Sequence, residues 1–304
     1  MRSRSPTRTY RDLLADSRRW TRFEPRTGDI IVCTPPKCGT TWTQAICAML
    51  VFGATELEAN PAELSPWLDL DRVPLEPVIA LLEEQTHRRI IKTHTPFDGI
   101  PWLEEAQYVC VYRDPRDAFF SLRNHLDNMK EPIRKGAADG SDEEAFRVWL
   151  SHAYTTSGAA ASSAPRPPSL SELLHHFDSF RAGAGLPNLG FYHYADLSRD
   201  PRGEIARIAA QLGIDASPAF VAGIAEATAF DRMRRQAERF APGASMGMWH
   251  DTTRFFNEGR SGQWRGVLSD EDDRRFHAAL EARLPASVAR WLVGGRTAGR
   301  LDGC

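Results

Sequence analysis

The chain has 304 residues, 42% of them hydrophobic, and a formal net charge of −2 from 38 Lys and Arg against 40 Asp and Glu. This length can bury a sizeable core, and the near-neutral charge argues against nucleic acid as a partner. No apolar run approaches the ~18 residues of a membrane span, and the five cysteines lack zinc-ligand spacing. We therefore expect reduced thiols in a cytoplasmic protein.

The first predicted element is a buried strand that begins at Ile30, followed by a turn at 35–39 and a helix over 40–52. A helix N-terminus gathers unpaired N–H groups and partial positive charge, so this strand, turn and helix predict an anion-binding loop. Lys37 adds a point charge to it. In the ATP-binding loop Gly-x-x-x-x-Gly-Lys-[Ser/Thr] the lysine follows the second glycine. Here Lys37 precedes Gly39, so the ATP motif is absent.

Strands and helices alternate along the following part of the chain. Further strands are predicted at 89–92, 108–112 and 189–194 from their apolar runs. The segment 157–169, rich in Ala, Ser and Pro, is predicted to be a surface loop or flap because it cannot build a core. The predicted helices cover residues 78–84, 117–130, 142–153, 170–180 and 201–212.

The alternating order favours an α/β fold with a central, mostly parallel sheet flanked by helices. In such a sheet, ligands bind outside the carboxyl ends of the strands. We expect a single domain of this kind over residues 21–294, preceded by a flexible N-terminus at 1–20 and followed by a C-terminal tail at 295–304. The sequence does not indicate an oligomeric state.

Basic and histidine side chains stand at the carboxyl ends of the predicted strands. Lys37 follows the first strand, Lys92 and His94 end the second, Arg113 follows the third, and His193 and Tyr194 end the fourth. Because these ends converge in a parallel sheet, the groups are expected to surround a strongly anionic ligand. The set suits transfer of an anionic group, in which a base accepts a proton and fixed cations stabilise the developing charge.

A series of motifs resembles the signature of cytosolic-type sulfotransferases that use 3′-phosphoadenosine 5′-phosphosulfate (PAPS), in the family's order from about residue 29 to residue 264. Short stretches such as Ser65-Pro-Trp67 and Arg113-Asp-Pro-Arg-Asp117 are especially similar to bacterial glycolipid sulfotransferases. The motifs are Thr-Pro-Pro-Lys-Cys-Gly-Thr-Thr-Trp at 34–42, Lys92-Thr-His94, Arg113 with Ser121, Tyr194-Ala-Asp196 and Gly259-x-x-Gly262-x-Trp264.

The resemblance implies a P-loop-kinase-like sulfotransferase fold and an enzyme that moves the sulfonate of PAPS to a hydroxyl of a small or lipid-linked acceptor. It also implies that His94 is the general base of an in-line attack. Lys37 would contact the bridging oxygen as its bond to sulfur breaks, and Lys92 would lie beside the sulfonate. For each of these the alternative is a structural or solvated side chain. The residues implied to bind PAPS or its product PAP are Lys37, Cys38, Gly39, Thr40, Thr41, Trp42, Arg113, Ser121, Tyr194, Thr228, Phe230, Phe256, Gly259 and Arg260.

The chain departs from the family at the segment that grips the 3′-phosphate. Where the family has Arg-Lys-Gly, this chain has Asn257-Glu258-Gly259, and Arg260 comes one position late. A carboxylate near a dianionic phosphate weakens binding unless Arg260 swings in or Glu258 turns outward. This departure leaves open a catalytically silent PAP-binding protein. A nucleotide-dependent kinase of related fold is a second alternative, although it would need the ATP loop that is absent here.

Apolar and aromatic side chains near the motifs are candidates for binding the acceptor. Pro66, Trp67, Phe97 and Trp102 are candidates for an apolar acceptor pocket, although several of them also suit a core. The similarity to glycolipid enzymes favours a lipid-linked sugar. No metal is expected, since a sulfonate has a single negative charge that lysines can offset.

Overall fold

The computed structural model describes residues 2–12, 14–131, 140–154 and 168–301. The predicted flap at 157–169 lies almost wholly outside these residues. Among the described residues, no helix is both long and apolar enough to cross a bilayer. The four described cysteines, Cys33, Cys38, Cys47 and Cys110, are buried and form no disulfide.

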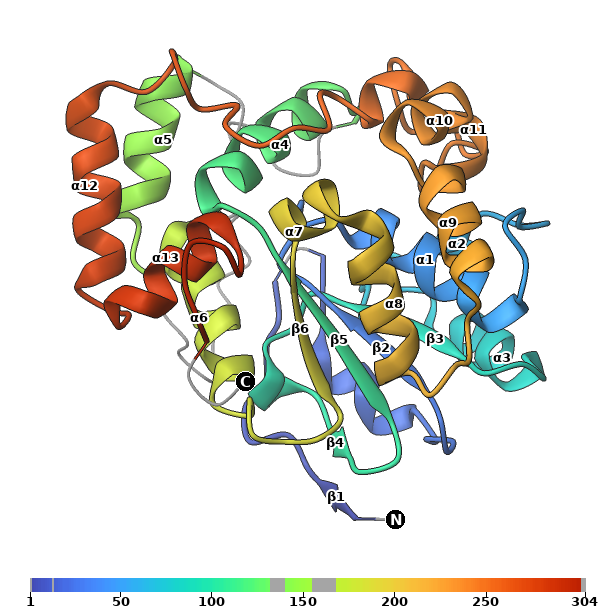
Figure 1. Cartoon of the computed structure of the whole chain (residues 1–304). Helices are drawn as coiled ribbons and strands as arrows, with labels where there is room; N and C mark the ends of the chain where they lie inside the picture. Colours follow the sequence, from blue (N-terminus) through green and yellow to red (C-terminus); the bar gives the residue numbers. More distant parts are fainter. Residues whose placement is uncertain (1, 13, 132–139, 155–167, 302–304) are drawn as a thin grey trace.

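Four parallel strands form the central sheet in the order β3, β2, β5, β6 (Figure 1). This parallel α/β architecture confirms the predicted fold class. Because β3 and β5 flank β2 on opposite sides, the strand order reverses at β2, and ligands of such sheets bind at this point. The predicted strand positions are correct to within one residue. The strands are β2 (Ile30–Cys33), β3 (Ile90–Thr93), β5 (Gln107–Tyr112) and β6 (Leu189–His193).

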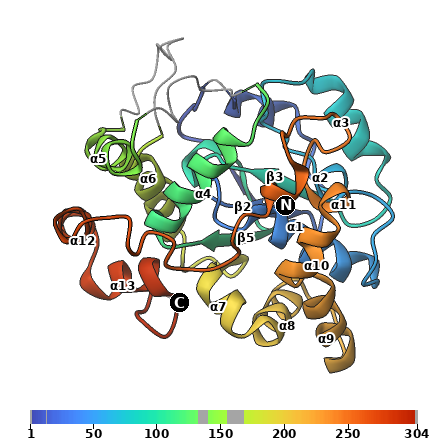
Figure 2. The ribbon, with the colours of Figure 1, turned by 90° about the horizontal axis from the view of Figure 1, so that it is seen from above.

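Helices cover both faces of the sheet, as Figure 2 shows from above. Ile31 and Cys33 of β2 belong to a core that includes α4, α5, α6, α12 and α13, whereas Ile30 and Val32 belong to a core with α1, α8 and α9. The helices are α1 (Thr40–Phe52), α2 (Pro61–Leu64), α3 (Leu75–Glu84), α4 (Pro115–Asp127), α5 (Asp142–Ser151), α6 (Leu170–Arg181), α7 (Tyr194–Arg199), α8 (Pro201–Gln211), α9 (Pro218–Ala227), α10 (Phe230–Arg235), α11 (Ala237–Phe240), α12 (Asp270–Glu281) and α13 (Ala286–Gly294).

Local chemistry sets the ends of the two helices nearest the predicted site. α1 has the predicted bounds because Gly39 and Gly53, both in the left-handed region, flank it. α4 begins at Pro115, two residues earlier than predicted. Proline suits a first helical position, and the Asp114 side chain accepts a hydrogen bond from the Arg116 N–H.

The two ends of the chain pack on the domain over their described parts. In the stretch expected to be flexible, β1 (Ser3–Arg4) pairs antiparallel with β4 (Trp102–Leu103). Trp20, in the 3-10 turn Ser17–Arg22, is 3% exposed. In the expected tail, the Arg296 N–H donates to the Asp196 carboxylate at 2.8 Å.

Candidate active site

The predicted anion-binding loop lies between β2 and α1 and has a strained backbone at its centre. Lys37 has a φ of 67°, and it is the only described residue other than glycine in the left-handed region. A lysine there costs ~1 kcal/mol or more, and such strain concentrates at functional sites. The hydroxyls of Thr34 and Thr40, which flank the loop, are 2.6 Å apart. The loop therefore presents the first turn of α1 at the carboxyl end of β2.

His94, at the end of β3, has an orientation fixed by the neighbouring strand. Its Nδ1 lies 2.6 Å from the Thr34 carbonyl oxygen. Because a carbonyl only accepts hydrogen bonds, the ring proton is on Nδ1, and Nε2 keeps its lone pair. Burial, followed by the nearby charge of Lys92, holds the pKa of His94 well below its usual range. His94 is thus a neutral imidazole with a free basic nitrogen.

Lys92 and Lys37 are brought to the same site. The Lys92 Nζ lies 4.2 Å from the centre of the Trp67 ring, and burial lowers its pKa to about 8. Burial, followed by the positive charges of Arg113 and Lys92, lowers the pKa of Lys37 to about 7. Like charges and burial both disfavour the ammonium form of these lysines. A bound anion would offset these effects, so the site suits a negatively charged ligand.

The buried carboxylate of Asp69 supports the end of β3. Its Oδ2 accepts hydrogen bonds from the hydroxyls of Thr93 and Thr95, each at 2.6 Å, and from the indole N–H of Trp20 at 3.0 Å. Burial raises the pKa of Asp69, and these hydrogen bonds oppose that rise. The two threonines flank His94, so this network fixes the backbone on both sides of the imidazole.

His125, on α4, joins the site although the sequence did not suggest it. Its Nδ1 lies 2.9 Å from the Lys37 Nζ. Burial, followed by the charges of Lys37 and Lys92, holds its pKa well below the usual range. The sequence held one indication of this role. His125 comes four residues after Ser121, so both lie on the same face of α4. Ser121 itself is half-buried.

The predicted nucleotide-binding residues of the loop, β5 and β6 also come together. The Trp42 and Tyr194 rings meet edge to face at 5.4 Å, and the Arg113 guanidinium lies 4.2 Å from the centre of the Tyr194 ring. The Arg113 Nη2 donates to the Arg260 carbonyl oxygen at 2.8 Å. Asp117, four residues after Arg113, accepts hydrogen bonds from the backbone N–H groups of residues 262 and 263.

The segment in which the chain departs from the family lies against α10. Gly259 has a φ of 65°, and a Cβ there would overlap the Phe230 ring, so glycine is required. Phe230 meets Phe256 edge to face at 6.4 Å. The Arg260 Nε lies 2.6 Å from the Glu258 carboxylate, and both side chains are exposed. Thr228 is buried, and its hydroxyl donates to a carbonyl of α9.

Two of the four predicted acceptor residues, Pro66 and Trp67, lie at the site, and Trp102 does not. Trp67 meets the His94 ring edge to face at 4.8 Å, and the Pro66 carbonyl accepts from the Lys92 N–H. Trp102 precedes β5 and donates to the Asn188 side chain, which precedes β6. It therefore lies at the amino ends of these strands, opposite the site, and its assignment to the pocket is wrong. Phe97 packs in the core on the rings of residues 108 and 180.

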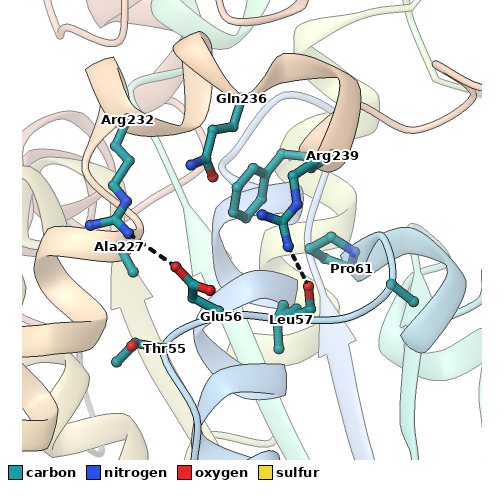
Figure 3. A pocket seen from close by; sticks show the side chains of 10 residues that line it. Thr55, Glu56, Leu57, Pro61, Ala227, Arg232, Gln236 and Arg239 are labelled. Carbon is teal, nitrogen blue, oxygen red and sulfur yellow. Dashed lines mark hydrogen bonds and ion pairs between the residues drawn. The ribbon is translucent and has the colours of Figure 1, made fainter.

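Two cavities lie apart from these residues. One, between the loop 55–59 and the helices α10 and α11, has a volume of about 20 Å³, which holds about one water molecule (Figure 3). There Arg232 pairs with Glu56, and Arg239 donates to the Leu57 carbonyl. The other, of about 510 Å³, lies beneath residues 3–9. In the described part of the chain, no cluster of three His, Cys, Asp or Glu side chains is placed to bind a metal ion.

Several known proteins are similar to this chain in sequence. A family model described as a sulfotransferase domain matches residues 27–288. Glycolipid sulfotransferases of Mycobacterium bovis and Mycobacterium tuberculosis are each 34% identical to this chain, and each match covers 94% of both proteins. An amine sulfotransferase of Oryctolagus cuniculus is 27% identical over 86% of this chain and 82% of its own length.

Solved structures agree in fold. A mouse sulfotransferase complexed with PAP has a TM-score of 0.68 at 20% identity, covering 92% of this chain and 91% of its own. A retinol dehydratase in complex with androsterone and PAP has a TM-score of 0.65 at 20% identity, covering 88% and 85%. At this identity the likeness shows the fold alone. The family match over residues 27–288 and the 34% identity with the mycobacterial enzymes show that the protein belongs to the sulfotransferase family and is a sulfotransferase.

Proposed function

We propose that the protein transfers the sulfonate of PAPS to a hydroxyl group by in-line attack, with His94 as general base. One observation carries the proposal: Lys37, Lys92, His94 and Arg113, from three separate strand ends, lie around one site. A site with this much positive charge suits an anion that reacts there. PAPS supplies an activated sulfonate, and the residues of the chain bind and orient it.

Unsatisfied polar atoms support an anionic nucleotide at this site. The Arg113 Nε and the Trp42 Nε1 are buried without a hydrogen-bond partner in the described part of the chain. A buried unpaired donor costs about 1–3 kcal/mol, which a bound phosphate oxygen would recover for the guanidinium. We assign the 5′-phosphosulfate to residues 37–42, the 3′-phosphate to Arg113 and Ser121, and the adenine to Trp42 and Tyr194.

In the proposed reaction, the free Nε2 of His94 accepts the proton of the acceptor hydroxyl as its oxygen attacks. Lys92 and Lys37 stabilise the negative charge that develops on the sulfonate and on the leaving phosphate oxygen. Thr34 keeps the His94 proton on Nδ1, so the basic nitrogen is available without a change of tautomer.

The acceptor is proposed to be a lipid-linked sugar. The mycobacterial relatives are named as glycolipid sulfotransferases, which favours this class over other hydroxyl compounds. Trp67 suits the same class, because its ring borders His94 and an aromatic face packs well on a sugar or an acyl chain.

Transfer of labelled sulfonate from PAPS to a panel of glycolipids, steroids and phenols tests this function. We expect label on at least one glycolipid. PAP binding without transfer to any acceptor would instead support a catalytically silent protein, an alternative suggested by Glu258. Turnover of Mg-ATP on the same panel would support a kinase.

Affinity for PAP is expected to fall as the pH rises from about 7 to about 9. With pKa values of about 7 for Lys37 and about 8 for Lys92, the free protein loses both charges over this range. An anionic ligand favours the charged lysines, so binding takes up protons and weakens by up to about tenfold per pH unit for each lost charge. Titration calorimetry in buffers of different ionisation heat measures both effects. Constant affinity over this range would contradict the proposed lysine contacts.

Arg260→Ala is expected to weaken PAP binding about 3-fold to 10-fold. The exposed ion pair with Glu258 is worth at most ~1 kcal/mol, so a 3′-phosphate can draw Arg260 away from it. Adenosine 5′-phosphate, which lacks the 3′-phosphate, is the matched control ligand and should bind both proteins equally. Equal losses for the two ligands would show that Arg260 does not contact the 3′-phosphate.

A further inference from the structure

The side chain of Lys37 ends between two rings from distant segments. Its Nζ lies 2.9 Å from the His125 Nδ1 on α4 and 4.9 Å from the centre of the Phe255 ring. We infer that His125 is a positioning residue for Lys37, holding the lysine nitrogen at the anion-binding loop through Nδ1. The inference rests on the proposed function, because the role of Lys37 in transfer belongs to that proposal.

The hydrogen-bond chemistry gives His125 a different task from that of His94. An ammonium group only donates, so a charged Lys37 requires the His125 Nδ1 to be the acceptor. The His125 ring proton is then on Nε2, the opposite tautomer from the one that Thr34 imposes on His94. The basic nitrogen of His125 is occupied by Lys37, whereas that of His94 is free. His125 therefore orients a cation, and His94 remains the candidate base.

The His125 ring is itself held in place by the segment 248–256. The Trp249 ring packs against it at 4.8 Å and the Phe255 ring at 5.8 Å. This segment is tied to the end of α4 by Asn128, whose side chain exchanges two hydrogen bonds with the Asp251 backbone at 2.8 and 3.1 Å. Because two rings pack on the imidazole and Asn128 holds the segment 248–256 against α4, the imidazole nitrogen stays in one position.

Two substitutions separate the hydrogen bond from the packing. His125→Phe keeps a ring between Trp249 and Phe255 but removes the acceptor, and it is expected to lower kcat about 10-fold to 100-fold with PAPS affinity changed less than about 3-fold. His125→Asn keeps an acceptor near the Nδ1 position and is expected to recover activity to within about 5-fold of the unsubstituted enzyme. In a Lys37→Met background, His125→Phe should cost less than a further factor of about 2, because the two residues act as one unit.

Full activity of His125→Phe would overturn the inference. It would also be overturned if His125→Phe lowered kcat by the same factor in the Lys37→Met background as in the unsubstituted enzyme. A second measurement does not depend on transfer. Nitrogen NMR of ring-labelled histidine should show His125 as the Nε2–H tautomer, and Lys37→Met should change that signal. An unchanged His125 signal overturns the inference whatever the activity. If the unsubstituted protein transfers no sulfonate, the proposed function fails, and the NMR result alone decides the role of His125.

Discussion

His94→Ala is expected to slow sulfonate transfer by about 10²–10⁴ while PAP affinity stays within about threefold of its original value. A positioned general base supplies a factor of this size, equivalent to ~3–5 kcal/mol of the activation barrier. The imidazole is already neutral, because burial and Lys92 keep its pKa low, and Nε2 already has a free lone pair. Removing the ring takes away the proton acceptor but none of the cations that bind the nucleotide.

The measurement is single-turnover transfer of labelled sulfonate alongside calorimetry with PAP. His87→Ala is the matched control, since His87 precedes β3, at the opposite end of the strand from His94, and contacts Phe52. That variant should keep full activity. Near-normal turnover by the His94 variant would rule out the proposed mechanism, and a large loss of PAP affinity would assign His94 to binding instead.

Lys37→Ala is expected to reduce kcat by at least ~10², because the ammonium group offsets the charge that develops on the leaving oxygen in a buried site. The effect should fall on kcat more than on the KM for PAPS. Lys92 and Arg113 remain to hold the ground-state anion, whereas no other described cation is placed on the loop itself.

Steady-state kinetics with PAPS as the varied substrate separates these quantities. Lys130→Ala is the control, because Lys130 is an exposed lysine three residues after α4 whose backbone N–H donates to the Met248 carbonyl oxygen. A raised KM with unchanged kcat for the Lys37 variant would mean that the lysine only binds PAPS and takes no part in the transfer step.

Features that local chemistry specifies could be predicted from the sequence. The bounds of α1 follow from two glycines that suit left-handed backbone, and the buried strands follow from short apolar runs. The convergence of Lys37, Lys92, His94 and Arg113 follows from the geometry of parallel strands, whose carboxyl ends share one edge. These predictions needed no knowledge of contacts between distant residues.

Contacts between distant segments could not be predicted in this way. Trp102 is a large aromatic residue of the kind that often lines pockets, yet its position is set by a hydrogen bond to Asn188. In the sequence, His125 resembles any other polar residue on a helix. The rings that pack on it, Trp249 and Phe255, lie more than 120 positions further along the chain. Arg113 has Asp117 nearby in sequence, but that carboxylate satisfies backbone N–H groups instead. Tertiary structure decides such pairings.

The hydrogen bond from Trp20 to Asp69 connects the amino-terminal segment to the candidate base. Displacing Trp20 would leave a buried carboxylate with one donor fewer, beside the threonines on either side of His94. Trimming the chain through Trp20 would therefore disturb the support of the candidate base, although the removed residues lie far from His94 in the sequence.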